Sequence, residues 1–226
     1  KAMYQDFWEG KKYNVSKNSE YANQTFVILP TNNLGRLNTL AEKLEAQDIE
    51  IYLNTSPIQT KSALKQTGDS VENFTIPVGS MIIPNLQPEA PLIAAILEFD
   101  AEIIESVLEE ERRQRLKNSS SIMYDTTAFN LTMMYGLEAV TVQENIQKNL
   151  KKWKPIEVNV DVQENALMWA VNGIDDRSVA FAARLMELGV EVRIIDKDAL
   201  LSEQSLPRGS VVVIDMDNPD YEGLSS

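Results

Sequence analysis

The chain has 226 residues, 43% of them hydrophobic and 24% charged, as in ordinary globular proteins. Its 21 basic and 34 acidic side chains give a net charge of −13, which argues against nucleic acid and anionic membranes as partners. It has no histidine and no cysteine, which excludes thiol and imidazole catalysis, disulfides and the usual zinc sites. Carboxylate chemistry, a lysine-assisted nucleophile or no chemistry at all remains.

No apolar run approaches the ~20 residues that a membrane-spanning helix needs, so we expect no membrane span in this segment. No signal peptide is visible, and the chain begins at Lys1 rather than at a start methionine. We therefore expect a piece of a longer protein, in which the absence of a targeting segment carries no information about the compartment.

Residues 1–24 are predicted to combine the end of a helix with a polar connection. The apolar run Gln24–Pro30 predicts a buried strand, and Asn32 and Asn33 offer N-cap side chains to the helix that follows. Ile49–Leu53 predicts a second strand. A strand, a helix and a strand over about thirty residues favour a βαβ unit with parallel strands.

The middle of the chain is predicted to add one strand and several helices. Phe74–Pro84 predicts a turn at Pro77–Gly79 that leads into a strand. Apolar spacing and capping residues indicate helices over Pro57–Gln66, Pro88–Glu98, Glu102–Lys117 and Asp125–Tyr135.

A second series of strand, helix and strand follows a basic, proline-containing stretch. Strands are expected over Ala166–Val171 and Val190–Ile195, with a helix over Ser178–Leu188 between them. The loop Asn172–Asp176 supplies capping residues for this helix. Leu206–Asp215 then predicts a turn and a third strand.

The two series align with each other without a gap, which indicates an internal repeat. The alignment that sets Leu44 opposite Leu185 also pairs charged residues and the apolar residues of helix and strand. The sequence Pro-x-Gly-Ser follows each series, at Pro77–Ser80 and at Pro207–Ser210.

The repeat predicts an α/β fold of two similar βαβ-containing halves, with a mainly parallel sheet and an intervening helical segment. In this fold each third strand would lie parallel to the strand that precedes its helix. Residues 25–147 would form the first half with a helical insertion, and residues 148–226 a second, truncated half.

Ligands of open α/β sheets bind beyond the carboxyl ends of the strands, where free N–H groups at a helix start favour anions. The loops Asn32–Gly35 and Asn172–Asp176 both lie between the end of a predicted strand and the start of a helix. Neither carries a glycine-rich phosphate motif, and plain helix capping is the alternative role for their polar residues. The candidate ligand-binding residues are Asn32, Asn33, Gln87, Asn172 and Asp175.

The segments IPVGSMIIPNLQPEAPLIAAILEFD and EEERRQRLKNSSSIMYDTTAFNLTMMYGLEA resemble the region after the peptidase domain in large zinc carboxypeptidases of the carboxypeptidase A-like superfamily. In those proteins a Gly-Ser strand runs into a Gln-Pro helix start, and a Tyr-Asp-x-Thr-Ala-aromatic helix ends near a glycine. Phe129 stands where tryptophan is more usual. The matching residues here are Gly79, Ser80, Gln87, Pro88, Tyr124, Asp125, Thr127, Ala128 and Phe129, and Gly209 and Ser210 repeat the Gly-Ser pair.

The resemblance implies a metallocarboxypeptidase parent whose zinc lies in its peptidase domain. It also implies a glutamine-amidotransferase-like α/β module in this region. The peptidase motif, His-x-x-Glu with a distant His, cannot occur in a chain without histidine, and an active amidotransferase needs a cysteine. We therefore expect no catalytic residue, no metal ligand and no cofactor in this chain.

Our leading hypothesis is a non-catalytic accessory region of a secreted or periplasmic zinc carboxypeptidase-like protein. It would support the peptidase domain, restrict its substrate or hold cell-envelope material. Its partners would be its own upstream peptidase domain and a peptide or cell-envelope substrate. Two alternatives remain open: a free-standing α/β module that binds a small ligand or glycan, and a carboxylate-based hydrolase.

Overall fold

The computed structural model describes residues 2–99, 103–123, 130–157, 166–201 and 204–219. The chain divides into two compact units. Unit 1 comprises Lys1–Pro30 and Leu40–Trp153, and unit 2 comprises Thr31–Thr39 and Lys154–Ser226.

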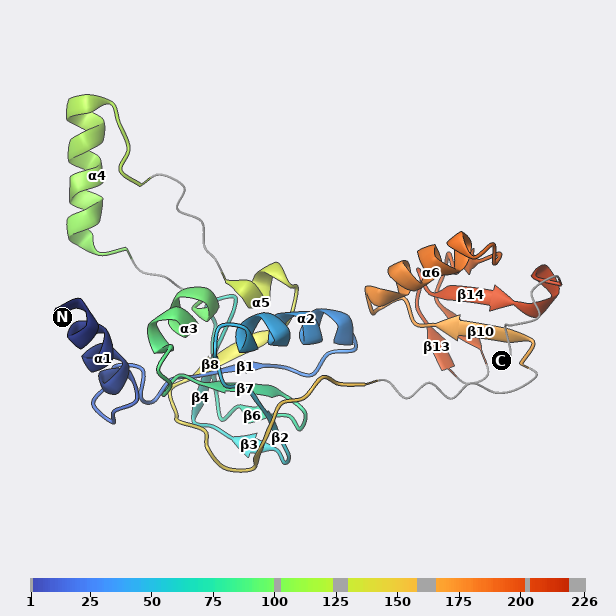
Figure 1. Cartoon of the computed structure of the whole chain (residues 1–226), viewed down its shortest axis with the longest axis horizontal. Helices are drawn as coiled ribbons and strands as arrows, with labels where there is room; N and C mark the ends of the chain where they lie inside the picture. The colour runs from blue at the N-terminus through green and yellow to red at the C-terminus, as the bar shows by residue number, and fades with distance from the viewer. Residues whose placement is uncertain (1, 100–102, 124–129, 158–165, 202–203, 220–226) are drawn as a thin grey trace. The chain divides into compact units, whose positions relative to one another are not determined.

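Unit 1 is built on a seven-stranded sheet with the order β5-β4-β8-β1-β7-β2-β9 (Figure 1). All its described ladders are antiparallel. A separate two-stranded sheet pairs β3 with β6. The strands are β1 (Thr25–Ile28), β2 (Tyr52–Asn54), β3 (Ile58–Gln59), β4 (Ser62–Lys65), β5 (Ser70–Glu72), β6 (Thr75–Ile76), β7 (Met81–Pro84), β8 (Ala139–Val142) and β9 (Leu150–Lys152).

Helices α3, α5 and the later turns of α2 lie along one side of this sheet (Figure 1). α3 begins with a proline in its first turn, where the missing N–H has no helical acceptor. The helices described before β8 are α1 (Ala2–Asn14), α2 (Leu34–Glu45), α3 (Ala90–Leu97), α4 (Glu105–Asn118) and α5 (Leu131–Met134).

The core of unit 1 surrounds the three central strands β8, β1 and β7, in which every residue is buried. Val27, Ile82 and Val140 form one cluster with Ile76 of β6. Side chains alternate along a strand, so the neighbours of these residues face the other side of the sheet, where the helices lie. Both faces of the sheet are therefore covered.

Unit 2 contains a three-stranded antiparallel sheet with the order β10-β14-β11. Helix α6 packs against β14 and lies along one side of this sheet (Figure 1). The elements are β10 (Met168–Val171), α6 (Arg177–Glu187), β11 (Arg193–Ile194), the hairpin β12 (Ala199–Leu201) and β13 (Gln204–Leu206), β14 (Val211–Ile214) and a 3₁₀ turn (Asp215–Asp217).

The prediction of two βαβ halves with a mainly parallel sheet is wrong. β7 lies between β1 and β2 and is antiparallel to both, so the two strands that flank α2 do not pair with each other. β14 has the same position between β10 and β11. β7 and β14, which were predicted to be parallel to the strand before their helix, are therefore antiparallel to it. The parallel α/β module that the resemblance implied is wrong for the same reason.

The structure nevertheless repeats an antiparallel element of another kind. We call residues 24–87 the N-terminal repeat and residues 167–218 the C-terminal repeat. The central strand is β7 in the N-terminal repeat and β14 in the C-terminal repeat. Each central strand pairs in the same register with the strand that follows the helix, β2 or β11. Leu53 lies opposite Met81, and Ile194 lies opposite Val211.

The helices of the two repeats end in the same way. The N–H of Ile49 donates to the C=O of Leu44 at 3.1 Å, and the N–H of Val190 donates to the C=O of Leu185 at 3.0 Å. The residue before each donor has a positive φ, 59° in one repeat and 83° in the other. These bonds satisfy carbonyls that the helix end would leave free, and they match the alignment of Leu44 with Leu185.

Candidate functional site

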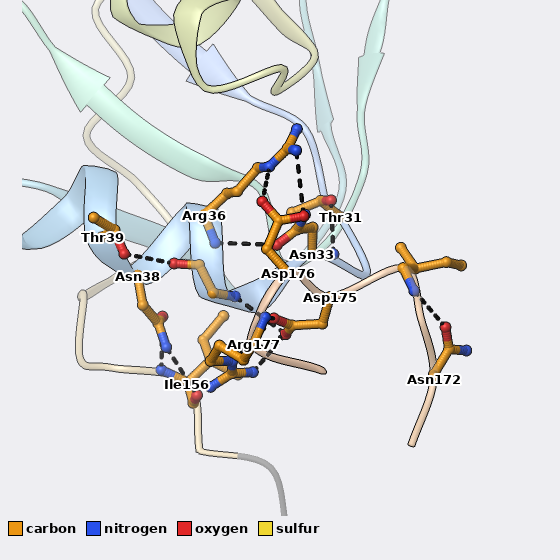
Figure 2. Close-up of polar contacts among 12 residues, drawn as sticks. Thr31, Asn33, Arg36, Asn38, Thr39, Ile156, Asn172, Asp175, Asp176 and Arg177 are labelled. Carbon is orange, nitrogen blue, oxygen red and sulfur yellow. Dashed lines mark hydrogen bonds and ion pairs between the residues drawn. The ribbon is translucent and has the colours of Figure 1, made fainter. Parts of the chain in front are cut away.

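Unit 2 brings the first turn of α2 against the start of α6 (Figure 2). We call this group the strand-end cluster: Asn33, Gly35, Arg36, Asp175, Asp176 and Arg177. Asn33 is the N-cap of α2, because its Oδ1 accepts a hydrogen bond from the N–H of Arg36 at 3.1 Å. Its own N–H donates to Thr31 Oγ1 at 3.1 Å.

Asp176 makes a bidentate ion pair with Arg36, whose Nε lies 2.5 Å from Oδ2 and whose Nη2 lies 3.2 Å from Oδ1. Asn33 Nδ2 also donates to Oδ1, at 3.1 Å. The hydrogen bond from Arg36, aided by that from Asn33, lowers the pKa of Asp176. Asp176 is therefore held as an ionised acceptor.

Asp175 is held more tightly, with its side chain only 15% exposed. Arg177 donates to it through Nη2 at 2.6 Å, through Nε at 3.0 Å and through its backbone N–H at 3.0 Å. The N–H of Gly35 donates to Oδ2 at 3.2 Å. The hydrogen bond from the Arg177 side chain lowers the pKa of Asp175, and the same bond raises the pKa of Arg177.

The anion site expected beyond the first strand is filled by the protein's own groups. The N–H groups of Gly35 and Arg36 already have the side chains of Asp175 and Asn33 as acceptors. A Cβ at position 35 would lie 2.7 Å from Asp175 Oδ1, so only glycine permits this approach. An external anion would have to displace Asp175.

Asn172 and Asn32, the other two candidates from the strand ends, are not members of the strand-end cluster. Asn172 Oδ1 accepts a hydrogen bond from the N–H of Ile174 at 2.9 Å, which forms a turn within the loop. The N–H of Gly173 donates to Ser210 Oγ at 3.0 Å. Asn32 is exposed.

Gln87 lies in unit 1, away from the strand-end cluster in the sequence and in the contacts that it makes. Its side chain is buried, with a residue exposure of 5%. Oε1 accepts from the N–H of Glu50 at 2.7 Å, and Nε2 donates to the C=O of Glu50 at 2.9 Å and of Pro84 at 2.7 Å. Gln87 thus joins the chain before β2 to the end of β7.

Asn218 makes the same set of bonds in the C-terminal repeat. Its Oδ1 accepts from the N–H of Glu191 at 2.6 Å. Its Nδ2 donates to the C=O of Glu191 at 3.2 Å and of Ile214 at 2.9 Å. Sequence reasoning missed this residue, although each of the two amides is followed by proline. We call Gln87 and Asn218 the amide clamps.

The Gly-Ser pairs of the predicted motif are also structural. Gly79 and Gly209 have φ of 81° and 91°, which favours glycine. The buried hydroxyls of Ser80 and Ser210 donate at 2.8 and 2.7 Å to the carbonyls of the prolines three residues earlier. The remaining motif residues Tyr124, Asp125, Thr127, Ala128 and Phe129 lie outside the described residues.

One further carboxylate is enclosed by hydrogen bonds. Those from the Ser121 hydroxyl, from the N–H groups of Met123 and Ile122 and from Arg115 lower the pKa of Glu111 to about 2. A carboxylic acid that acts as a general acid at neutral pH needs a raised pKa. The pKa values of Glu111, Asp175 and Asp176 are lowered instead, which suits ion pairing rather than proton transfer.

Two properties apply to the part of the chain that the structure describes. Its acidic side chains form no group of three or more that could hold a metal ion. None of its helices combines the length and the apolar character needed to cross a bilayer.

Comparisons of this chain with models of protein families, with curated proteins and with solved structures found no match.

Proposed function

We propose that this chain is a non-catalytic accessory region of a zinc carboxypeptidase-like protein, in which it supports the peptidase domain or restricts its substrate. The sequence resemblance around Phe74–Gly136 supports the parent. The lack of histidine and cysteine supports a non-catalytic role, because the zinc and its ligands would belong to the upstream peptidase domain.

The observation that carries the non-catalytic role is that the buried or half-buried polar candidates are used up by internal bonds. Gln87 makes three hydrogen bonds to backbone groups. Asp175 and Asn33 cap the first turn of α2. Polar side chains whose hydrogen-bonding groups are already bonded within the protein stabilise its fold, and they have few free donors or acceptors for a substrate.

The chemistry of the isolated chain is tested by elemental analysis and by incubation with peptides. We expect less than one tenth of a zinc ion per chain and no release of the C-terminal residue, with a known zinc carboxypeptidase as the positive control. One tightly held zinc per chain, or release of C-terminal residues by the purified chain, would contradict the proposal.

The parent is tested by the coding sequence upstream of Lys1. The proposal requires a His-x-x-Glu motif and a later histidine there. Removal of residues 1–226 from that protein should change its stability or its choice among peptide substrates. A peptidase with unchanged stability and substrate choice after this deletion would refute the accessory role.

A further inference from the structure

The C-terminal repeat has a central strand between two outer strands, as the N-terminal repeat has, but it leaves the outer strands β10 and β11 without a buried residue. Every residue of β1 is buried, whereas β10 has no buried residue. Apolar side chains on or beside these outer strands remain in contact with solvent, including Leu167, directly before β10, at 75% exposure and Ile194 of β11 at 59%. The strand β10 therefore leaves open the surface that its equivalent β1 buries in the N-terminal repeat.

The backbone of β10 presents an open edge. The N–H of Asp215 donates to the C=O of Leu167 at 3.0 Å, which fixes the alternation of the antiparallel ladder with β14. Residues two apart face the same neighbour, so the N–H and C=O groups of Met168 and Ala170 point away from β14. In the part of the chain that the structure describes, no strand pairs with this edge.

The N-terminal repeat shows what fits such an edge. The bond equivalent to that between Asp215 and Leu167 joins the N–H of Asn85 to the C=O of Gln24 at 2.8 Å. By this equivalence, Thr25 and Val27 correspond to Met168 and Ala170. Thr25 lies opposite Val142 and Val27 opposite Val140, both in the antiparallel strand β8. The matching occupant of β10 is an antiparallel strand rich in β-branched residues.

Charge adds a second requirement for the occupant. Residues 154–226 hold 14 acidic and 6 basic side chains, which account for more than half of the chain's net charge of −13. This net negative charge attracts an incoming strand with basic flanks and repels a second copy of the same unit.

We propose that the outer edge of β10 binds an extended strand of a partner protein, with β-branched residues at its centre and lysine or arginine at its flanks. The main-chain groups of Met168 and Ala170 supply the hydrogen bonds, as in other cases where a peptide adds a strand to a sheet. This site rests on the geometry of unit 2, and its failure would leave the carboxypeptidase proposal untouched.

The test uses residues 1–226 and the capped synthetic peptide Lys-Lys-Val-Thr-Val-Thr-Val-Lys-Lys. We expect the peptide to slow the hydrogen exchange of the Met168 and Ala170 amides at least about tenfold. Thr25 and Val27, already paired with β8, serve as internal controls and should not change. A peptide with glutamate in place of the four lysines should bind at least about tenfold more weakly.

Ala170→Pro removes an N–H that points away from β14, so it should abolish peptide binding without removing a ladder bond. The control Ala170→Val keeps this N–H and should retain binding. Thermal melts check that both variants fold. If Ala170→Pro does not fold, the hydrogen exchange of the unmodified chain with and without peptide decides whether β10 binds the peptide.

Three results would overturn the proposal. One is unchanged exchange at Met168 and Ala170 with peptide present at millimolar concentration. Another is protection that rises with protein concentration in the absence of peptide, which would assign the edge to a second copy. The third is complete protection of both amides in a longer form of the same polypeptide, which would assign the edge to that polypeptide itself.

Discussion

At the scale of single residues, the amide clamps do the same work in both repeats. Each uses one side-chain carbonyl and one NH₂ group to satisfy both backbone groups of a glutamate before the second strand, and a carbonyl at the end of the third strand. A buried backbone group that loses its partner costs about 1–3 kcal/mol, more than the net gain from forming a typical hydrogen bond.

Gln87→Ala should therefore lower the free energy of unfolding by about 1–3 kcal/mol. The variant leaves the N–H of Glu50 and the C=O of Pro84 without their partner. Gln47, exposed in the turn after α2, is the matched control, and Gln47→Ala should change stability by less than about 0.5 kcal/mol. Equal effects of the two substitutions in urea unfolding would show that the clamp does not stabilise the fold.

The lowered pKa of Asp175 makes the strand-end cluster sensitive to acid. The ionised carboxylate is the form that accepts the bonds from Arg177 and Gly35, so its contribution is complete above the ordinary aspartate pKa of 3.8. This contribution is lost as the pH falls through the lower pKa of the folded state. The free energy of unfolding of the wild type should therefore decrease as the pH is lowered below about 4.

Asp175→Asn tests this pH dependence, because asparagine cannot be ionised. The variant should be less stable than the wild type at about pH 7, and the difference should shrink as the pH is lowered toward about 3. Urea unfolding monitored on unit 2 measures both. A difference that stays constant over this range would mean that the ionised form of Asp175 does not stabilise the folded state.

At the scale of elements, the helices of the two repeats have equivalent positions and different burial. Leu44 of α2 is fully buried, whereas the equivalent Leu185 of α6 is only partly buried. Leu44→Ala should cost about 2–5 kcal/mol, as for other buried leucines. Leu185→Ala should cost less than about 2 kcal/mol, because part of its surface remains in water. Thermal melts in which Leu185→Ala is as destabilising as Leu44→Ala would contradict the difference in burial.

The sequence predicted several elements because they depend on local patterns. The helical spacing of Leu37, Leu40, Ala41 and Leu44 and the capping side chain of Asn33 anticipated α2. The strand–helix–strand order of both repeats was predicted in the same way. Plain capping, the alternative considered for Asn33, is one of the roles that the structure gives to this residue.

The direction of the strands could not be predicted from these patterns. An apolar run covered on both faces is typical of a parallel strand, but β1 and β7 are covered on both faces in an antiparallel sheet. The helix expected over Pro57–Gln66 is wrong as well, since β3 and β4 occupy this segment. Tertiary pairing with distant strands prevails there over local propensity.

The candidate site was also only partly predictable. Asp175 and Asn33 were candidates, but the ion pair of Arg36 with Asp176 joins residues 140 positions apart. No short-range spacing signals such a contact. The equivalence of Gln87 and Asn218 depends on one shared chemical group and a following proline, which is too little to detect before the backbone positions are known.

At the scale of the whole molecule, the two units differ in how completely their sheets are covered. In unit 1 the three central strands are entirely buried, whereas in unit 2 the strands β10 and β11 are largely in contact with solvent. Burial of apolar surface is the main stabilising contribution to folding, so unit 2 should open at a lower free energy than unit 1.

Equivalent amides in the two repeats measure this difference. The N–H of Gly79 donates to the C=O of Asn54, and the N–H of Gly209 donates to the C=O of Ile195. In native-state hydrogen exchange, Gly209 should exchange with a smaller free energy of opening than Gly79. A larger free energy of opening at Gly209 would exclude a less stable unit 2.

One nuclear Overhauser spectrum of the chain in D₂O tests the antiparallel pairing of both repeats. In antiparallel pairs without mutual hydrogen bonds the Cα atoms approach to about 4.5 Å, which brings the two Hα atoms into contact. Val27 with Ile82 and Ala170 with Val212 are such pairs. We expect strong Hα–Hα cross-peaks for both pairs. The absence of either cross-peak in a spectrum with complete assignments of these four residues would contradict the antiparallel pairing.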